Sequence, residues 1–383
     1  MKIALIRKKY TPFGGAERYI DALIGQLLDL GHEVHIFANE WQIVNAERKA
    51  QNGKLFFHNV PMIKGLSVLK VLSFALNARR LVKKERFDVI HSFERTLYQD
   101  IYRAGDGCHK EWLIQRAKYE PLWKTILVRM NPLHWAFLWI EKRLFAPENT
   151  KIVIANSRRG KEEIIKHYHF PEERIQVIYN GVDTSRFNPA NREKYRSAVR
   201  MEFGLFDSDR VILFLGSGFE RKGLSFALEM LAGLSDSRIK LVVAGKDNPQ
   251  KYRKLANQFG IKDRVIFIGP TKEPEKLYAA ADVFFLPTIY EPFSNACLEA
   301  MASGVPVVTT RVNGASEWIR EGIDGYVIDD LGDMSSCRSK LAQCLGQISC
   351  KAADTRRFQL SWQEHVEAVK SIYDGVFCIR AGG

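Results

Sequence analysis

Short apolar runs alternate along the chain with amphipathic stretches. The run KIALIR at residues 2–7 precedes a stretch at 16–31 whose apolar side chains recur every three to four positions, and EVHIFA follows at 33–38. This order predicts a strand, a helix and a second strand. Later apolar runs of the same kind are FDVIHSF (87–93), KIVIANS (151–157), VILFLG (211–216), IKLVVAG (239–245), RVIFIG (264–269), DVFFLP (282–287) and VPVVTT (305–310). Continuous apolar strands separated by helices predict an α/β protein with parallel sheets covered on both faces.

The two series of strands predict two doubly wound domains facing each other across a cleft, since 383 residues exceed one ordinary core. We place the first domain at residues 1–178 and the second at 210–360. The segment 179–209 contains an Asn-Gly turn and Pro189 and is the predicted linker. The last stretch, 361–383, is predicted to be a helix that crosses back to the first domain. The N-terminus is typical of a first strand rather than a signal peptide, and no apolar run is long enough for a membrane-spanning helix.

Cysteine usage and charge narrow the class of protein. The six cysteines form no CxxC pair, which argues against a zinc site or a disulfide framework and favours a reducing cytoplasm. The formal net charge is +13, and residues 1–175 carry +11 of it, with 30 Lys and Arg against 19 Asp and Glu. We therefore expect the first half of the chain to meet an anionic partner.

Two glycine-containing loops follow predicted strands, where ligands bind in open α/β sheets. Gly14 and Gly15 open the first helix, and GSGFERKG at 216–223 ends with Arg221 and Lys222 before a glycine. Glycines let the backbone approach a ligand, and two fixed cations can bind a diphosphate without a metal. Neither loop has the GxGxxG or GxxxxGK[ST] pattern, which disfavours NAD binding and ATP hydrolysis of the P-loop type.

The stretch EPFSNACLEA at 291–300 places Glu291 in a loop and Glu299 on the helix that follows it. An ordinary helix start, capped by Ser294 or Asn295, is the simple alternative. If the helix begins near Ser294, its free amides favour an anion. Glu299 can then accept hydrogen bonds from two adjacent hydroxyls, as a ribose presents, and Glu291 from a second sugar. The DxD sequence at 207–209 precedes a strand instead of following one, so we interpret it as a surface turn rather than a metal site.

These loops, in this order, resemble the retaining glycosyltransferases of family 4, which have the GT-B fold. The resemblance covers nearly the whole chain and depends on GGAER, NGVD (180–183), GSGFERKG, VVAGKD (242–247), the block at 278–310 with its E-x7-E spacing, NGASEWI and GIDGYVI. Within the family, KYTPFGGAER and IYRAGDGCHKEW are most similar to the lipopolysaccharide core glucosyltransferases that use UDP-glucose.

The resemblance implies a role for each loop. Arg221 and Lys222 would hold the diphosphate and stabilise the leaving UDP, with Gly14 and Gly15 closing on the phosphates. Glu299 would bind the ribose, and Glu291 the transferred sugar. The residues that would assist at the start of the helix are Phe293, Ser294 and Asn295. No metal and no cofactor besides the nucleotide sugar would be needed.

Three further assignments follow from the resemblance. Asp106, in AGDGCH, matches the acid of the first domain at the reaction centre, but the family more often has a histidine there, so His109 remains an alternative. Arg186 would either contact a phosphate or be a linker surface residue. Pro270 and Thr271 lie where the family binds the base, mainly through backbone groups.

The stretch 109–145 predicts a second kind of contact. It holds four of the seven tryptophans, interleaved with Lys and Arg. Rings and cations suit an anionic membrane surface, and the alternative is that the rings pack inside the first domain. We expect a peripheral protein on the cytoplasmic face of the membrane, acting on a lipid-linked or core glycan. A nonhydrolysing UDP-sugar epimerase and a transferase with an exopolysaccharide or lipid acceptor remain alternatives, and no nucleic-acid module is recognisable.

Overall fold

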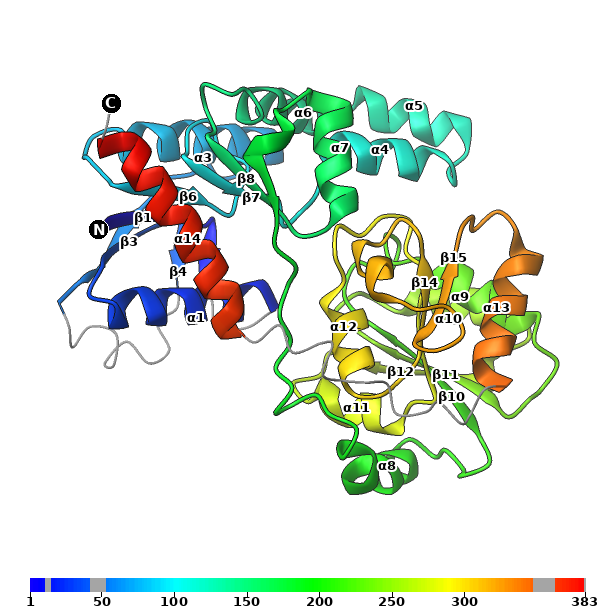
Figure 1. Cartoon of the computed structure of the whole chain (residues 1–383). Helices are drawn as coiled ribbons and strands as arrows, with labels where there is room; N and C mark the ends of the chain where they lie inside the picture. The colour runs from blue at the N-terminus through cyan, green and yellow to red at the C-terminus, as the bar shows by residue number, and fades with distance from the viewer. Residues whose placement is uncertain (11–14, 42–52, 347–361, 382–383) are drawn as a thin grey trace. The chain divides into compact units, whose positions relative to one another are not determined.

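The computed structural model describes residues 1–10, 15–41, 53–346 and 362–381. The chain forms two compact units. Unit 1 comprises Met1–Tyr179 and Trp362–Gly383, and unit 2 comprises Asn180–Ser361 (Figure 1). Each unit is an α/β domain with its own parallel sheet.

Unit 1 contains a seven-stranded sheet in which every pair of neighbouring strands is parallel. In sheet order the strands are β5 (Leu55–Asn59), β3 (Glu33–Ala38), β1 (Lys2–Ile6), β6 (Val89–Ser92), β7 (Ile101–Arg103), β8 (Ile152–Ala155) and β9 (Ile175–Val177). Two short strands, β2 (Lys9–Tyr10) and β4 (Glu40–Trp41), pair separately. The helices are α1 (Gly15–Asp29), α3 (Ser67–Val82), α4 (His109–Ala117), α5 (Leu122–Met130), α6 (Pro132–Leu144), α7 (Arg158–Tyr168) and the short 3-10 helix η1 (Glu172–Arg174).

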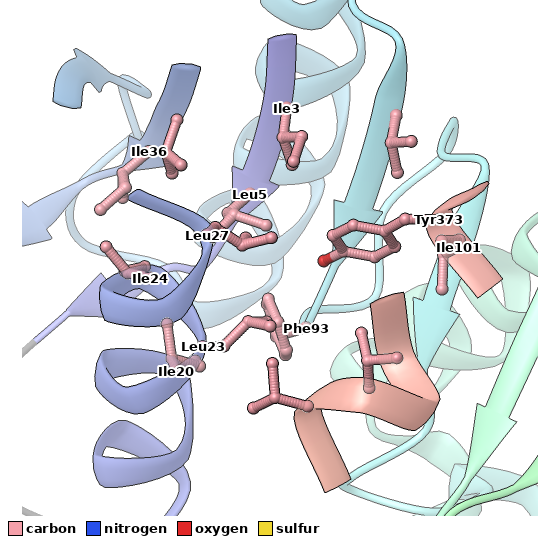
Figure 2. Packing of buried hydrophobic residues seen from close by; sticks show 14 of the residues in the cluster. Ile3, Leu5, Ile20, Leu23, Ile24, Leu27, Ile36, Phe93, Ile101 and Tyr373 are labelled. Atoms are coloured by element: carbon pink, nitrogen blue, oxygen red, sulfur yellow. The ribbon is translucent and has the colours of Figure 1, made fainter. Parts of the chain in front are cut away.

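The C-terminal helix α14 (Trp362–Ala381) completes the core of unit 1. Its buried Val369, Tyr373 and Val376 belong to the same apolar cluster as the strand residues Ile3 and Leu5. Figure 2 shows the ring of Tyr373 directed toward the strands of the sheet. The Tyr373 hydroxyl also lies 2.6 Å from Nδ1 of the buried His91. The last helix is therefore fixed to unit 1 by apolar packing and by a buried polar contact.

Unit 2 contains a six-stranded sheet that is also parallel throughout. In sheet order the strands are β12 (Val265–Gly269), β11 (Ile239–Ala244), β10 (Arg210–Leu215), β13 (Val283–Leu286), β14 (Val307–Thr310) and β15 (Gly325–Ile328). The helices are α8 (Asn191–Glu202), α9 (Leu224–Ala232), α10 (Gln250–Gln258), α11 (Pro274–Ala280), α12 (Asn295–Ala302) and α13 (Met334–Gly346), with 3-10 helices η2 (Lys262–Arg264) and η3 (Gly314–Trp318).

Helix α8 is tied to the sheet of unit 2 by a buried charge cluster. Arg196 and Arg200 bind the carboxylate of Asp282 at 2.8 and 2.7 Å, and that carboxylate also accepts the amide of Val211 at 2.8 Å. Burial opposes ionisation of Asp282, but the amide and the arginines outweigh it and lower its pKa. The polar start of β13 is thereby satisfied inside the domain.

The long apolar runs form the central strands, as the pattern predicts. The sequence analysis did not predict the short strands β5, β7, β9 and β15. Strand β7, for example, has three residues and ends on Arg103, so it carries too few apolar positions for a recognisable run. Among the described residues, no helix is long and apolar enough to cross a membrane.

Candidate functional site in unit 2

The candidate site lies where the strand order of unit 2 reverses. Strand β10 pairs with β11 on one side and with β13 on the other, so the chain leaves β10 and β13 in opposite directions across the sheet. In open α/β sheets the loops beyond the carboxyl ends of two such strands form the usual ligand-binding crevice. Here these loops contain Gly216–Gly223 and Pro287–Ser294.

Three features shape the loop after β10. Gly216 has φ +143°, and a Cβ there would lie 2.8 Å from the end of the Lys222 side chain, so this side chain lies against the glycine. The Asp247 carboxylate accepts the amides of Gly218 and Phe219 at 3.0 and 2.6 Å. Gly223 has φ +79°, and a Cβ on it would come within 1.8 Å of the Pro287 carbonyl oxygen. Only glycine permits this approach of the two loops.

Arg221 and Lys222 converge on one carboxylate oxygen of Glu291. Oε2 of Glu291 lies 2.8 Å from the Arg221 guanidinium and 3.3 Å from the Lys222 ammonium. Arg221 also donates to the carbonyl of Tyr290 at 3.0 Å. Glu291 is buried, which by itself raises the pKa of a carboxyl group, but the two cations outweigh burial and hold its pKa below the usual range. The cluster therefore carries a net charge of +1 at neutral pH.

Helix α12 begins beside this cluster, at the position the sequence predicts. Ser294 is its N-cap, and the Ser294 hydroxyl accepts the Cys297 amide at 3.3 Å. The backbone amide of Ser294 donates to Oδ1 of the buried Asn313 at 3.2 Å and is satisfied within the protein. Asn295 binds Nδ2 of Asn180 through its side-chain oxygen at 2.6 Å. Phe293 is buried just before the cap.

Glu299 lies on α12 and points to a different partner from Glu291. The Tyr278 hydroxyl donates to Oε2 of Glu299 at 3.0 Å and lies at the same distance from the Ala296 carbonyl. Tyr278 is fully buried, and burial, followed by the charge of Glu299, raises its pKa well above the usual value. The phenol therefore remains protonated and holds one oxygen of Glu299 in place.

Arg186 is paired inside unit 2 rather than lying free on the linker surface. It binds the Glu275 carboxylate at 2.6 Å and donates to the Lys272 carbonyl at 2.7 Å. These contacts hold the loop that follows β12, which carries the exposed Pro270 and Thr271. The Thr271 hydroxyl accepts the amide of Glu273 at 3.0 Å, which closes a local turn.

The DxD sequence at 207–209 lies in the turn before β10, at the amino end of the sheet. Asp209 is buried and accepts the amide of Phe206 at 2.8 Å. The carbonyl of Asp209 accepts a hydrogen bond from the Arg200 guanidinium. These contacts give the segment the role of a turn.

Asp106 and His109, the two candidates in unit 1, have different surroundings. The Asp106 side chain is 60% exposed, and its carboxylate lies 3.6 Å from the Arg95 guanidinium. His109 begins α4, and its Nε2 lies 3.0 Å from Nδ1 of His134. Burial, with the nearby charges of Arg95 and His134, lowers the pKa of His109 to about 3. The imidazole is therefore neutral at physiological pH and already has a hydrogen-bond partner.

A buried ion pair holds the turn that carries Asp106. Arg95 donates to the Glu141 carboxylate at 2.8 Å and to the carbonyl of Gly107 at 2.8 Å. Glu141 is 1% exposed and also accepts the amide of His109 at 2.7 Å. One carboxylate thus holds the start of α4 directly and the preceding turn through Arg95. Gly14 lies outside the described residues, and Gly15 is the first residue of α1.

The tryptophans of residues 109–145 lie largely at the surface. The exposed fractions are 64% for Trp123, 68% for Trp135 and 43% for Trp139, while Trp112 is half-buried against the Arg116 guanidinium. The alternative that the rings fill the core of the first domain is therefore not what the structure shows. Helix α5 has no buried residue at all.

Three residues that the sequence analysis did not single out organise the site of unit 2. They are Asp247, Tyr278 and Asn313. Each falls within a stretch that carries the family resemblance, namely VVAGKD, the 278–310 block and NGASEWI. What the sequence could not show was their partners, because each binds a group 18 to 29 positions away.

Comparisons with known proteins agree with this architecture. The family model described as "Glycosyltransferase Family 4" matches residues 13–186, and the one described as "Glycosyl transferases group 1" matches 195–346. The chain is 26% identical over 358 residues to the lipopolysaccharide glucosyltransferase WaaG of Escherichia coli K12, with 92% of each chain covered. A crystal structure of WaaG superposes with a TM-score of 0.77 at 24% identity, covering 100% of both chains. Anabaena HepE in complex with UDP and glucose gives a TM-score of 0.68 at 18% identity, with 98% of this chain and 99% of HepE covered.

Two Rossmann-like domains, with a cationic loop and a helix start at the strand-order reversal of the second, define a GT-B glycosyltransferase. The chain is a glycosyltransferase whose first domain matches the family 4 model and whose second domain matches the group 1 model.

Proposed function

We propose that this glycosyltransferase moves a hexose, glucose, from UDP-glucose to a membrane-associated glycan such as the lipopolysaccharide core, with retention of configuration. The observation that carries the proposal is the convergence of Arg221 and Lys222 on Glu291 beside the start of α12. Two relatives support it, because one is a lipopolysaccharide glucosyltransferase and the structure of another contains UDP and glucose.

The chemistry follows from where charge develops. When the bond from sugar to phosphate breaks, the sugar becomes oxocarbenium-like and the diphosphate gains negative charge. Arg221 and Lys222 lower the barrier by stabilising that charge, without requiring a metal. Glu291 binds hydroxyls of the transferred sugar and Glu299 those of the ribose. The acceptor attacks from the face that the diphosphate leaves, and the departing phosphate takes the acceptor's proton.

The remaining candidates take supporting roles in this proposal. Backbone groups of Pro270 and Thr271 bind uracil, and Arg186 holds their loop in place. Gly14 and Gly15 approach the phosphates. Asp106 is favoured over His109 as the acid that contacts substrate, since its carboxylate is exposed whereas His109 is hydrogen-bonded to His134.

The acceptor side of the proposal places the protein on the cytoplasmic face of a membrane. Its support is the exposed set of tryptophans in residues 109–145 together with the excess positive charge of the first half of the chain. Rings of this kind reach headgroup depth, and cations pair with lipid phosphates. Binding to vesicles that contain phosphatidylglycerol, with loss of binding at high salt, tests this part separately from catalysis.

Transfer from UDP-glucose tests the catalytic part. Arg221→Ala and Glu291→Ala should each lower the rate of transfer by about 100-fold or more while each variant remains folded, as its cooperative thermal unfolding will show. Arg238→Ala is the matched control, because Arg238 forms an exposed ion pair with Asp236 at the amino end of β11, whereas the site lies beyond the carboxyl ends of the strands. Full transfer by either site variant contradicts the assignment. Formation of a UDP-sugar epimer without acceptor would instead indicate the epimerase.

A further inference from the structure

Helix α5 exposes an uninterrupted apolar arc. Leu122, Trp123, Leu127 and Met130 are 77, 64, 58 and 70% exposed, and Ile126 lies between them at 49%. At 100° per residue these five side chains span less than half of the helix circumference. No residue of α5 is buried. A continuous exposed apolar surface of this kind indicates a binding surface.

The opposite side of α5 forms one wall of an open cavity. Thr125 and Val128 line it from α5, Leu113 and Ala117 from α4, and Leu138 from α6, and the cavity has a volume of 320 Å³. Ligand pockets commonly have volumes of about 300–1,000 Å³ and predominantly apolar linings. The cavity can therefore accept an apolar chain, and the helix that bounds it is the one that presents the apolar arc.

Cations outnumber acids around this cavity. Lys110, Arg116 and Arg129 line it, against the single carboxylate of Glu120. Glu120 is already bound to Arg116 at 2.8 Å and to Lys124 at 2.7 Å. Lys110 and Arg129 are exposed, and in the part of the chain that the structure describes neither forms a salt bridge. An apolar cavity with two available cations is complementary to an amphiphile with an anionic head.

We propose that the cavity between α4, α5 and α6 binds one acyl chain of an anionic lipid, whose phosphate is held by Lys110 and Arg129. This inference rests on the proposed membrane-bound function and extends it from a surface contact to a defined lipid site. The outer arc of α5 lies among the surrounding lipids while the cavity side holds a single chain. A second copy of the protein is the poorer occupant, because residues 1–175 carry +11 and two such surfaces repel.

The test measures binding of monomeric dodecyl phosphate to the full-length protein by calorimetry. Val128→Trp and Ala117→Phe fill the cavity from opposite walls and should each weaken binding at least about tenfold. Leu127→Glu alters only the outer arc, so it should bind dodecyl phosphate within about twofold of the parent while losing recruitment to phosphatidylglycerol vesicles. Inorganic phosphate and dodecanol should each bind far more weakly than dodecyl phosphate. Thermal unfolding midpoints identify any variant that is misfolded.

Three outcomes overturn the proposal. They are an unchanged affinity in both folded cavity-filling variants, a loss of dodecyl phosphate binding in Leu127→Glu, and an affinity for dodecanol equal to that for dodecyl phosphate. Failure of the membrane-bound function has a different signature. In that case the parent protein is not recruited to phosphatidylglycerol vesicles at low salt, whatever its affinity for dodecyl phosphate.

Discussion

Both units have a carboxylate–cation pair where their strand order reverses, but the two pairs differ in electrostatic state. In unit 1 the reversal lies between β1 and β6, and Arg7 following β1 lies 3.4 Å from Glu94 following β6. In unit 2 Glu291 receives two cations. Burial raises the pKa of Glu94, and the charge of Asp106 adds to the rise, although Arg7 and Lys8 oppose it. In unit 2, Lys222 and Arg221 outweigh burial and lower the pKa of Glu291.

The difference shows how one architecture can serve two purposes. A second cation beside the acid keeps the unit 2 cluster positive, as a diphosphate requires. In unit 1 the charges of Arg7 and Lys8 do not offset the burial of Glu94, so its carboxyl group is less readily ionised, which suits contact with neutral hydroxyls.

Replacing the carboxylate by a neutral amide should lower the rate of transfer much more at Glu291 than at Glu94. Glu291→Gln should lower transfer by about 100-fold, since an ionised carboxylate is lost, yet UDP should bind at least as tightly because both cations are released. Glu94→Gln should lower transfer by less than about fivefold, because the environment of Glu94 already disfavours its charge. Kinetics and UDP titration of both variants measure the contrast. Weaker UDP binding by Glu291→Gln would contradict it.

At acidic pH, Glu291 and Glu94 should change the stability of the folded protein in opposite directions. The folded-state pKa of Glu291 is lowered, so its contribution is present above the unfolded value of about 4.3 and is lost as pH falls through the folded pKa. The folded-state pKa of Glu94 is raised, so stability falls as pH rises from about 4.3 through the folded pKa.

Thermal midpoints between about pH 3 and 7 measure both effects. Glu291→Gln should flatten the loss of stability at the acid end. Glu94→Gln should remove a decrease that appears on raising the pH. Shifts of the same sign in both variants would show that the two carboxylates do not differ as described.

Two glycine substitutions should distinguish displacement of the Lys222 side chain from the effect of backbone strain. Gly216→Ala introduces a Cβ 2.8 Å from the Lys222 side chain and should lower transfer about tenfold by displacing that ammonium. Gly218→Ala is the matched control, since its φ of +82° is similarly unfavourable but its Cβ meets Arg221 only at 3.9 Å. Equal loss of transfer in both variants would assign the effect to backbone strain alone.

The smallest effect concerns the last helix. Tyr373→Phe removes the buried hydrogen bond between the Tyr373 hydroxyl and Nδ1 of His91, which should lower the stability of unit 1 by about 1–3 kcal/mol. UDP affinity should remain within about twofold, because Tyr373 packs in the core of unit 1 and the proposed diphosphate contacts lie in unit 2. Denaturant unfolding and UDP titration give the two readouts, and a marked loss of UDP binding would contradict the separation of the units.

Much of the fold could be predicted from local patterns. Runs such as VILFLG and DVFFLP are buried on both faces and therefore continuously apolar, which makes them recognisable without a structure. The start of α12 was predicted for a similar reason, since Ser294 caps it through a bond to a residue three positions away. The strands β5 and β7 were missed because strand pairing rather than an apolar run defines them.

For the candidate site, too, some features could be predicted from the sequence and others could not. The cationic loop, the E-x7-E spacing and the tryptophan-rich stretch 109–145 could be recognised from the sequence alone, because residue type and short spacing specify them. Three features became visible only in the folded chain: both cations share one oxygen of Glu291, Asp247 and Asn313 organise the neighbouring loops, and α5 separates an apolar arc from a cavity. The physical reason is that burial and pairing depend on groups brought together by the sheet and by helix packing, and these groups are far apart along the chain.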